Sequence, residues 1–189
     1  MKGFALLFVV VALASCGSSR VVSDQATGVN LSDAARVYTL VNLHPDEKLS
    51  KLYAINYQQS GLIPVCSEVQ FEKVGKKRLV FKVSQTGKTY TYDHYRALPE
   101  TFEEHLSRVF GASCDREKIA SLSQLDRDGI QSGSVSVGMT KQGVIYAIGY
   151  PPGHATPSLE TNEWKYWVNR FRMMLVVFDA TGHVSNIKR

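Results

Sequence analysis

The chain has 189 residues, of which 44% are hydrophobic, and a formal net charge of +5. This length allows one ordinary domain or two small ones. The positive charge is mild and scattered, and the one basic cluster, Lys76-Lys77-Arg78, lies between two strand-like segments where a solvated turn is expected. The composition therefore argues against a nucleic-acid partner and is compatible with a position near anionic lipid head groups.

The start of the chain has the layout of an export signal. Lys2 is followed by an uninterrupted apolar run over residues 4–14, and a run this short is typical of a signal peptide, because a membrane span needs about 20 residues. Small residues lie directly before and after Cys16, so the segment resembles the lipobox of a bacterial lipoprotein, in which the thiol is acylated and becomes the new N-terminus. We expect a signal peptide over residues 1–15 and a lipid on Cys16. The alternative is an ordinary signal peptide with a coincidental cysteine.

Residues 16–32 are rich in Gly, Ser, Thr and Val without a sustained period, which predicts a flexible tether between lipid and fold. Two cysteines then remain, Cys66 and Cys114. An even pair in an exported protein is a plausible disulfide. Two free cysteines are the alternative, because the sequence does not place their Cα atoms within bonding reach.

The segment 33–97 is predicted to be a β-rich module. Short runs of β-branched and aromatic residues are separated by turn residues, and the expected strands are 37–41, 52–57, 61–65, 68–74, 78–84 and 89–92. The last two form the clearest hairpin, with residues 85–88 as its turn. This many short strands suggest a small barrel or sandwich, and an SH3-like barrel is our specific expectation.

Residues 98–130 are predicted to be a helical connector. Phe102, Leu106 and Val109 recur at helical spacing, and the pattern continues more weakly over 116–125. We expect the sequence Asp126-Arg127-Asp128-Gly129 to break the second helix.

The segment 131–189 is predicted to be a second module, so that the whole chain is α+β. Thr140 is the expected N-cap of a helix that stops at Gly149. Strands follow over 164–168, 173–178 and 184–187, with 179–182 as the last turn.

Four short motifs near the C-terminus resemble the SmpA/OmlA (BamE-like) family in their order and spacing. They are Gly138-Met139-Thr140-Lys141-Gln142, Gly149-Tyr150-Pro151, Trp164-Lys165-Tyr166, and residues 175–179 with 182–184. The resemblance covers about the last third of the chain. It implies a small domain in which a helical pair packs on a three-stranded antiparallel sheet. Many members are anchored by lipid to the outer membrane and face the periplasm, and the best-known member is an accessory subunit of the machine that folds β-barrel outer-membrane proteins.

Searching for catalytic or cofactor chemistry gives little. The sequence has no phosphate loop, dinucleotide fingerprint or nucleophile elbow. Asp126-Arg127-Asp128-Gly129 resembles part of a calcium loop, but the twelfth position is Val137 instead of a glutamate. A Cys66–His94 pair could in principle serve a cysteine peptidase, although Cys66 lies at a strand edge without support for a thiolate. We expect no enzyme activity, no cofactor and no metal.

Aromatic residues are the other candidates for function. Five tyrosines either line a groove for a peptide or glycan or pack in the core: Tyr53, Tyr57, Tyr90, Tyr92 and Tyr95. In the C-terminal sheet, strand alternation places Trp167 on the face opposite Trp164 and Tyr166. If that face is open, Trp167 with Arg170 and Arg172 would form a partner-binding surface.

These features predict a non-enzymatic interaction or assembly factor, anchored by lipid to the outer membrane and facing the periplasm, with an envelope protein as partner. Gly17 and Ser18 after Cys16 lack the aspartate that commonly retains lipoproteins in the inner membrane. The alternative is a peptidoglycan-binding or enzyme-inhibiting envelope module that uses the tyrosines. A peptidase that uses Cys66 is a third, less favoured, reading.

Overall fold

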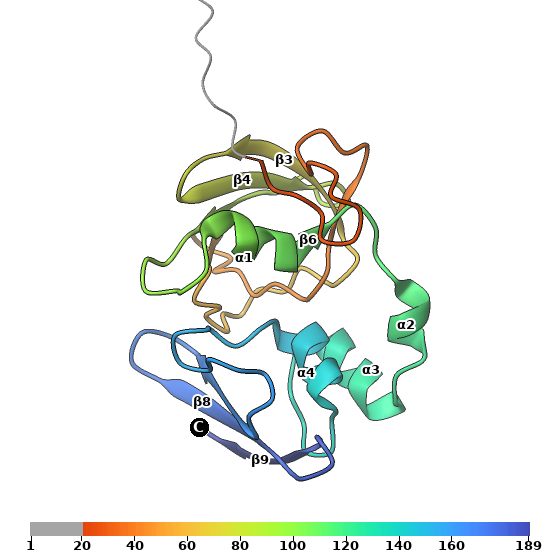
Figure 1. Ribbon diagram of the computed structural model, residues 1–189, viewed down its shortest axis with the longest axis vertical. Helices are drawn as coiled ribbons and strands as arrows, with labels where there is room; N and C mark the ends of the chain where they lie inside the picture. The colour runs from red at the N-terminus through yellow and green to blue at the C-terminus, as the bar shows by residue number, and fades with distance from the viewer. Residues whose placement is uncertain (1–20) are drawn as a thin grey trace, which may run out of the picture.

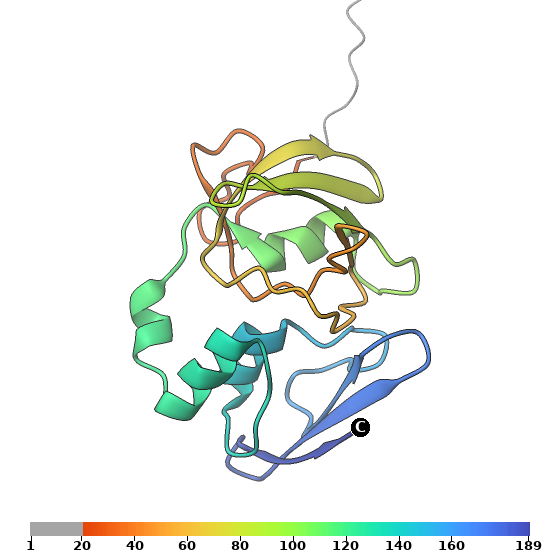
Figure 2. The same ribbon diagram turned by 180° about the vertical axis from the view of Figure 1, so that it is seen from behind.

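The computed structural model describes residues 21–189, so the predicted signal peptide and Cys16 lie outside the described residues. The expected α+β class is confirmed (Figures 1 and 2). A curled six-stranded mixed sheet forms one module, and a separate three-stranded antiparallel sheet with two helices forms the other.

The six-stranded sheet has the order β2-β5-β4-β3-β1-β6. Its strands are β1 (Val37–Thr39), β2 (Lys51–Tyr53), β3 (Glu68–Val74), β4 (Arg78–Val83), β5 (Thr89–Asp93) and β6 (Phe110–Gly111). All neighbours are antiparallel except β2 and β5. Leu79 and Phe81 on β4 and Tyr92 on β5 point into the core, because side chains alternate along a strand.

Helix α1 (Phe102–Val109) carries the chain from β5 to β6 and buries Phe102, Leu106 and Val109 in this core. Its start is fixed by a capping box, in which Thr101 accepts a hydrogen bond from Glu104 N and the Glu104 carboxylate accepts one from Thr101 N at 2.7 Å. The helix that we predicted from these residues therefore exists, but it belongs to the first module and not to a connector.

The second module places two helices on one face of a three-stranded sheet (Figure 1). Its elements are α3 (Gln124–Ser132), α4 (Lys141–Ile148), β7 (Glu163–Trp167), β8 (Met173–Phe178) and β9 (Val184–Lys188). Trp164 and Tyr166 on β7 point toward the helices, together with Val176 on β8. The predicted Thr140 cap is confirmed, since its side chain accepts from Gly143 N at 3.0 Å, and Gly149 ends the helix at φ +76°.

Two predictions along the connector and tether are wrong. The segment Asp126-Arg127-Asp128-Gly129 does not break a helix but lies inside α3, because Ser123 caps the helix and Asp126 is buried against the start of α4. Residues 21–32 do not form a flexible tether. Val22 and Leu31 are buried, and a bridge between Ser23 and Asn30 closes a small hairpin that packs on the first module.

The strands predicted over 52–57 and 61–65 are shorter than expected. The first ends at Tyr53, and Asn56 adopts a left-handed conformation with φ 56°. The second contributes only a bridge between Leu43 and Ile63. The chain in this region turns toward the second module instead of extending the sheet, and Asn56 Nδ2 donates to Ile148 O at 2.8 Å.

Only the short helix α2 (Arg116–Ala120) lies between the modules in sequence. The two modules nevertheless share one continuous hydrophobic core. Buried polar contacts add to it, since Asn42 Nδ2 donates to Ile130 O at 2.7 Å and to Ala147 O at 3.0 Å. The two modules are therefore packed against each other and are not separate domains joined only by a linker.

Candidate functional site

Aromatic rings from both modules meet at one surface. Tyr53 and Tyr57 have ring centroids 5.6 Å apart, Tyr95 lies 5.7 Å from His154, and His154 stacks on Trp167 at 5.3 Å. These five side chains, here called the junction surface, are half-buried or exposed. Rings that remain accessible in this way offer large contact areas to a partner.

The backbone holds the junction surface together across the module boundary. Tyr57 forms a parallel bridge with Trp167 at the edge of β7. Gln58 N donates to Trp167 O at 2.9 Å, and Gln59 Nε2 donates to Val168 O at 3.1 Å. A loop of the first module thus covers the outer edge of β7 and places its tyrosines beside the tryptophan.

The turn between β7 and β8 extends this surface with exposed cations. Asn169 Oδ1 accepts hydrogen bonds from Phe171 N at 2.9 Å and from Arg172 N at 3.0 Å, which fixes the turn. Phe171 is 83% exposed, and the Arg170 guanidinium lies 4.4 Å above its ring. We call Arg170, Phe171 and Arg172 the hairpin tip.

The Asp93 carboxylate, which is held by two basic side chains, lies at the border of the junction surface. Asp93 accepts from Arg78 and pairs with Lys51 Nζ at 2.7 Å, while that ammonium lies 4.8 Å above the Tyr53 ring. Burial opposes ionisation of Asp93, but its hydrogen bonds with Arg78 and Lys51 outweigh burial and lower its pKa. The Asp93 carboxylate therefore neutralises part of the positive charge of Arg78 and Lys51, and it fixes the Lys51 ammonium over the Tyr53 ring.

Burial is also the main reason why the pKa of Tyr57 is raised, with Tyr95 and Tyr53 adding to it and Arg170 opposing. The hydroxyl stays protonated at neutral pH and can donate a hydrogen bond to a partner. The junction surface is thus a set of aromatic rings next to basic side chains.

The structure brings together the predicted trio Trp167, Arg170 and Arg172 at one end of the three-stranded sheet. As predicted, Trp167 points away from the face that buries Trp164 and Tyr166. One face of its ring is covered by His154, a residue to which the sequence assigned no role. No local pattern connects residue 154 to residue 167, because the contact depends on the path of the intervening loop.

For two of the five tyrosines, the structure agrees with core packing, the second of the two predicted alternatives. Tyr90 is 5% exposed and Tyr92 is 3% exposed, since both point into the core of the first module. The Tyr92 hydroxyl lies 2.8 Å from His105 Nε2, and His105 Nδ1 lies 3.4 Å from Glu100 Oε1. A neutral His105 with its proton on Nδ1 satisfies both contacts, by accepting from Tyr92 and donating to Glu100.

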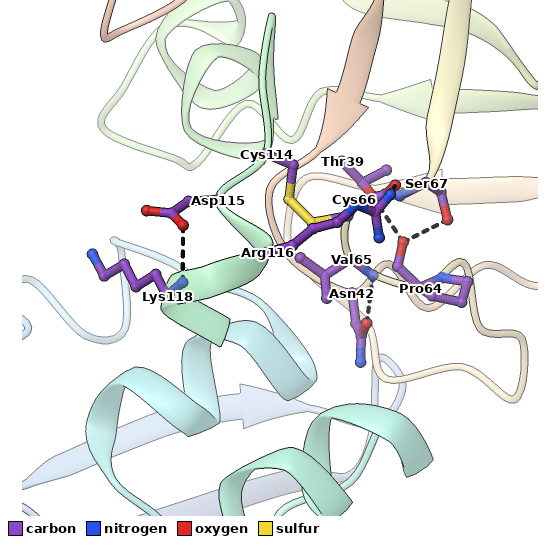
Figure 3. Close-up of a disulfide and its surroundings, with 10 residues drawn as sticks. All are labelled: Thr39, Asn42, Pro64, Val65, Cys66, Ser67, Cys114, Asp115, Arg116 and Lys118. Atoms are coloured by element: carbon purple, nitrogen blue, oxygen red, sulfur yellow. Dashed lines mark hydrogen bonds between the residues drawn. A yellow bond between two sulfur atoms is a disulfide. The ribbon is translucent and has the colours of Figure 1, made fainter. Parts of the chain in front are cut away.

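Cys66 and Cys114 form a disulfide, with their Cα atoms 5.4 Å apart (Figure 3). Cys66 has φ 62° and is held by a hydrogen bond from its N–H to Thr39 O at 2.8 Å, and Arg116 donates to Cys66 O at 2.9 Å. The bond fixes the start of the α2 segment to the first module. It also leaves Cys66 without the thiol that a Cys66–His94 nucleophile would need.

Residues 21–189, the part of the chain whose structure is described, provide neither a membrane-spanning helix nor a set of metal ligands. No helix in this range is both long and apolar enough to span a bilayer. The same range contains no group of three His, Cys, Asp or Glu side chains placed to hold a metal ion. Comparison of the chain with protein-family models, curated proteins and solved structures gave no match.

Proposed function

We propose that this protein is a non-enzymatic interaction or assembly factor that is anchored by lipid to the outer membrane and contacts an envelope protein in the periplasm. The observation that carries the proposal is the junction surface with its adjacent hairpin tip. Tyr, Trp and Arg are the residue types that dominate the energetics of protein–protein contacts. Here they come from two modules that are fixed to each other by backbone hydrogen bonds. Such a rigid arrangement loses little conformational freedom on binding.

The module architecture supports finer proposals about the fold. The helix pair α3 and α4 on a three-stranded antiparallel sheet is the arrangement implied by the resemblance to the SmpA/OmlA family. We accordingly propose an SmpA/OmlA-like domain for the second module. The curled sheet of the first module is compatible with an SH3-like barrel, which we propose for it.

The position of the first described residues indicates which end of the molecule would lie nearer the membrane. The first described residues lie beside β3, at the end of the molecule remote from the three-stranded sheet (Figure 1). With a lipid on Cys16, the three-stranded sheet would lie on the side of the molecule away from the outer membrane, and the hairpin tip would lie at the side, next to the first module (Figure 1). Only the short segment 17–20 separates Cys16 from the described fold. The body would therefore stand close to the membrane rather than at the end of a long tether.

Site-specific photocrosslinking in intact cells tests this proposal. A benzoylphenylalanine replaces Phe171 at the hairpin tip, and a matched probe replaces Val137, which is also exposed but precedes α4 at the other end of the sheet. We expect a discrete adduct with one envelope protein from position 171 and none from position 137. The adduct should disappear when Trp167→Ala is added, and Cys16→Ser should move the chain from the membrane fraction to the soluble fraction. Identical adducts from both positions, or none from 171, would contradict the proposal.

A further inference from the structure

A concave site lies on the α2 side of the molecule, where both modules and the segment between them meet. It has a volume of about 400 Å³. Arg108 of α1 and the N-terminal turn at Asp24 form one side, Gln142 and Tyr146 of α4 form another, and residues 113–119 close it. We call this site the α2 cleft. Its volume falls within the range of small-molecule sites, which often lie where two domains meet.

Several polar groups in the α2 cleft have no partner among the described residues. Across residues 21–189, no hydrogen bond or ion pair engages the Ser113 hydroxyl, the Lys118 ammonium, the Gln142 amide or the Tyr146 hydroxyl. Figure 3 shows Asp115 and Lys118 on the side of the segment opposite Arg116 and the disulfide. These donors and acceptors come from separate elements but face one shared space.

The α2 cleft carries no excess of charge. Two basic residues, Arg108 and Lys118, are balanced by two acidic residues, Asp24 and Asp115. The Asp24 carboxylate is already occupied, since it accepts from Thr27 N at 2.7 Å and from Ala112 N at 2.9 Å. The Arg108 guanidinium is likewise committed, 4.5 Å above the ring of Tyr150. This balance disfavours a phosphate or another strongly anionic ligand, which needs several converging cations.

The remaining lining is apolar and aromatic. Ile119 and Ile145 contribute aliphatic walls, and the half-buried Tyr146 contributes a ring that no other ring or cation stacks on in the described chain. Burial raises the pKa of Tyr146, with Asp115 and Tyr150 adding to it, so its hydroxyl remains a donor at neutral pH. Flat apolar faces with hydroxyls and amides at their rims are complementary to such walls, and sugar rings have this chemistry.

We propose that the α2 cleft binds a short neutral saccharide, with Tyr146 stacking on a sugar ring and Gln142 and Ser113 hydrogen-bonding its hydroxyl or acetamido groups. The site is separate from the junction surface, and the proposal stands whether or not the partner role is correct. The disulfide contributes by fixing Cys114, and with it the neighbouring Ser113 and Asp115, to the first module. A saccharide of one or two rings suits the volume.

The test is a titration of the full chain, purified in detergent with its disulfide formed, followed by amide chemical shifts. The probes are N,N′-diacetylchitobiose, maltose and trialanine. We expect saturable shifts with at least one disaccharide at the side-chain amide of Gln142, and at least a tenfold weaker affinity in Gln142→Ala and in Tyr146→Ala. Tyr146→Phe should retain most of the affinity, because it keeps the ring and removes only the hydroxyl.

Tyr95→Ala serves as the matched control, because it removes an exposed ring from the junction surface and should leave saccharide affinity unchanged. Gln142 is half-buried and its side chain makes no hydrogen bond with any residue of the described range 21–189, so its variant should fold as the wild type does. Binding of trialanine alone, binding that survives Gln142→Ala and Tyr146→Ala, or binding lost with Tyr95→Ala would each overturn the proposal. So would the absence of saturable shifts with both disaccharides. None of these outcomes bears on the crosslink from position 171.

Discussion

Asp126 joins the two helices of the second module. It is 1% exposed, and its carboxylate accepts from Thr140 N and from Ser123 Oγ, both at 2.8 Å. A Cβ added at Gly143 would overlap Asp126 Oδ1, so the glycine leaves room for the carboxylate. The aspartate therefore aligns the start of α3 with the start of α4.

Removing this carboxylate should be costly. Asp126→Ala leaves the half-buried Thr140 N–H without this acceptor and opens a void in place of the buried carboxylate, and we expect a loss of about 3 kcal/mol in the free energy of unfolding. Urea denaturation measures it. Asp128→Ala, an exposed position on the same helix, is the matched control and should change stability by less than about 0.5 kcal/mol. Equal effects of the two substitutions would argue against the role assigned to Asp126.

Two buried histidines predict how stability depends on pH. Burial lowers the pKa of both His44 and His105 below the ordinary value of 6.5. The unfolded chain therefore binds more protons just below pH 6.5, and stability is present above this pH and is lost as the pH falls through it. Each histidine should contribute up to about 1.4 kcal/mol per pH unit between its folded pKa and 6.5.

The measurement is urea unfolding at several pH values between about 7 and 5, for the wild type, His44→Asn and His105→Gln. Each substitution should flatten the slope of unfolding free energy against pH. Glu100, whose pKa is lowered chiefly by its hydrogen bond with His105, acts only below its ordinary value of 4.5 and does not disturb this window. A slope that is unchanged in both variants would contradict the assignment.

At the scale of elements, α2 is held only partly by packing, since Ile119 packs against the core but remains partly exposed. None of its residues is buried. Its N-cap Asp115 accepts from Lys118 N at 2.8 Å, and the disulfide precedes it by one residue (Figure 3). The disulfide therefore helps to hold this segment against the first module, whereas α1 and α4 are held by their buried hydrophobic faces.

The disulfide should accordingly carry much of the stability. It spans a sequence separation of 48 residues, for which loop-closure entropy predicts about 4 kcal/mol. The double variant Cys66→Ser, Cys114→Ser should lose this amount in chemical denaturation. Reductant added to the wild type should reproduce the same midpoint and leave the double variant unaffected, and a wild type indifferent to reductant would refute the prediction.

Elements with a complete local pattern were predictable from the sequence. The β4–β5 hairpin, α4 with its two caps, and the three C-terminal strands lie within a residue or two of their expected bounds. What failed depends on distant contacts. The sequence Asp126-Arg127-Asp128-Gly129 is typical of a turn. It is nevertheless helical here, and Asp126 accepts a hydrogen bond from Thr140 N at the start of α4. Residues 21–32 have the composition of a linker, but Val22 and Leu31 are buried in a core whose other residues come from distant segments.

The candidate site was predictable only in part for the same reason. Strand alternation placed Trp167 on the face opposite Trp164 and Tyr166, because the rule needs only local sequence. It could not tell Tyr95, which is exposed, from Tyr92, which hydrogen-bonds His105 in the core. The α2 cleft had no local signature, since its walls come from both modules and from the segment between them.

At the scale of the whole molecule, the first module caps a helix of the second. The last carbonyls of a helix have no partner within it. Those of α4 are satisfied across the boundary, because Asn42 Nδ2 and His44 Nε2 reach Ala147 O at 3.0 and 3.1 Å, and Asn56 Nδ2 reaches Ile148 O at 2.8 Å. Polar contacts of this kind fix the orientation of the modules as well as their proximity.

We therefore expect one cooperative unfolding transition. Both tryptophans lie on β7 of the second module, so tryptophan fluorescence reports that module, while far-ultraviolet circular dichroism reports both. The two midpoints should coincide in the wild type. Asn42→Ala removes bonds to Ile130 O, Ala147 O and Val65 N, and should cost about 3 kcal/mol and separate the midpoints. Separate midpoints in the wild type would show that the modules are independent.

The strand order of the first module has a consequence for how the chain folds as it is made. β1 lies between β3 and β6, so Tyr38 pairs with both Glu68 and Gly111. The sheet cannot close until residue 111 has emerged, and pairings this distant in sequence form slowly. Cys114 follows only three residues later, so in a chain emerging from its N-terminus the sheet can close just before the disulfide can form. The disulfide would then form in a module whose strands are already paired, and its formation need not direct that pairing.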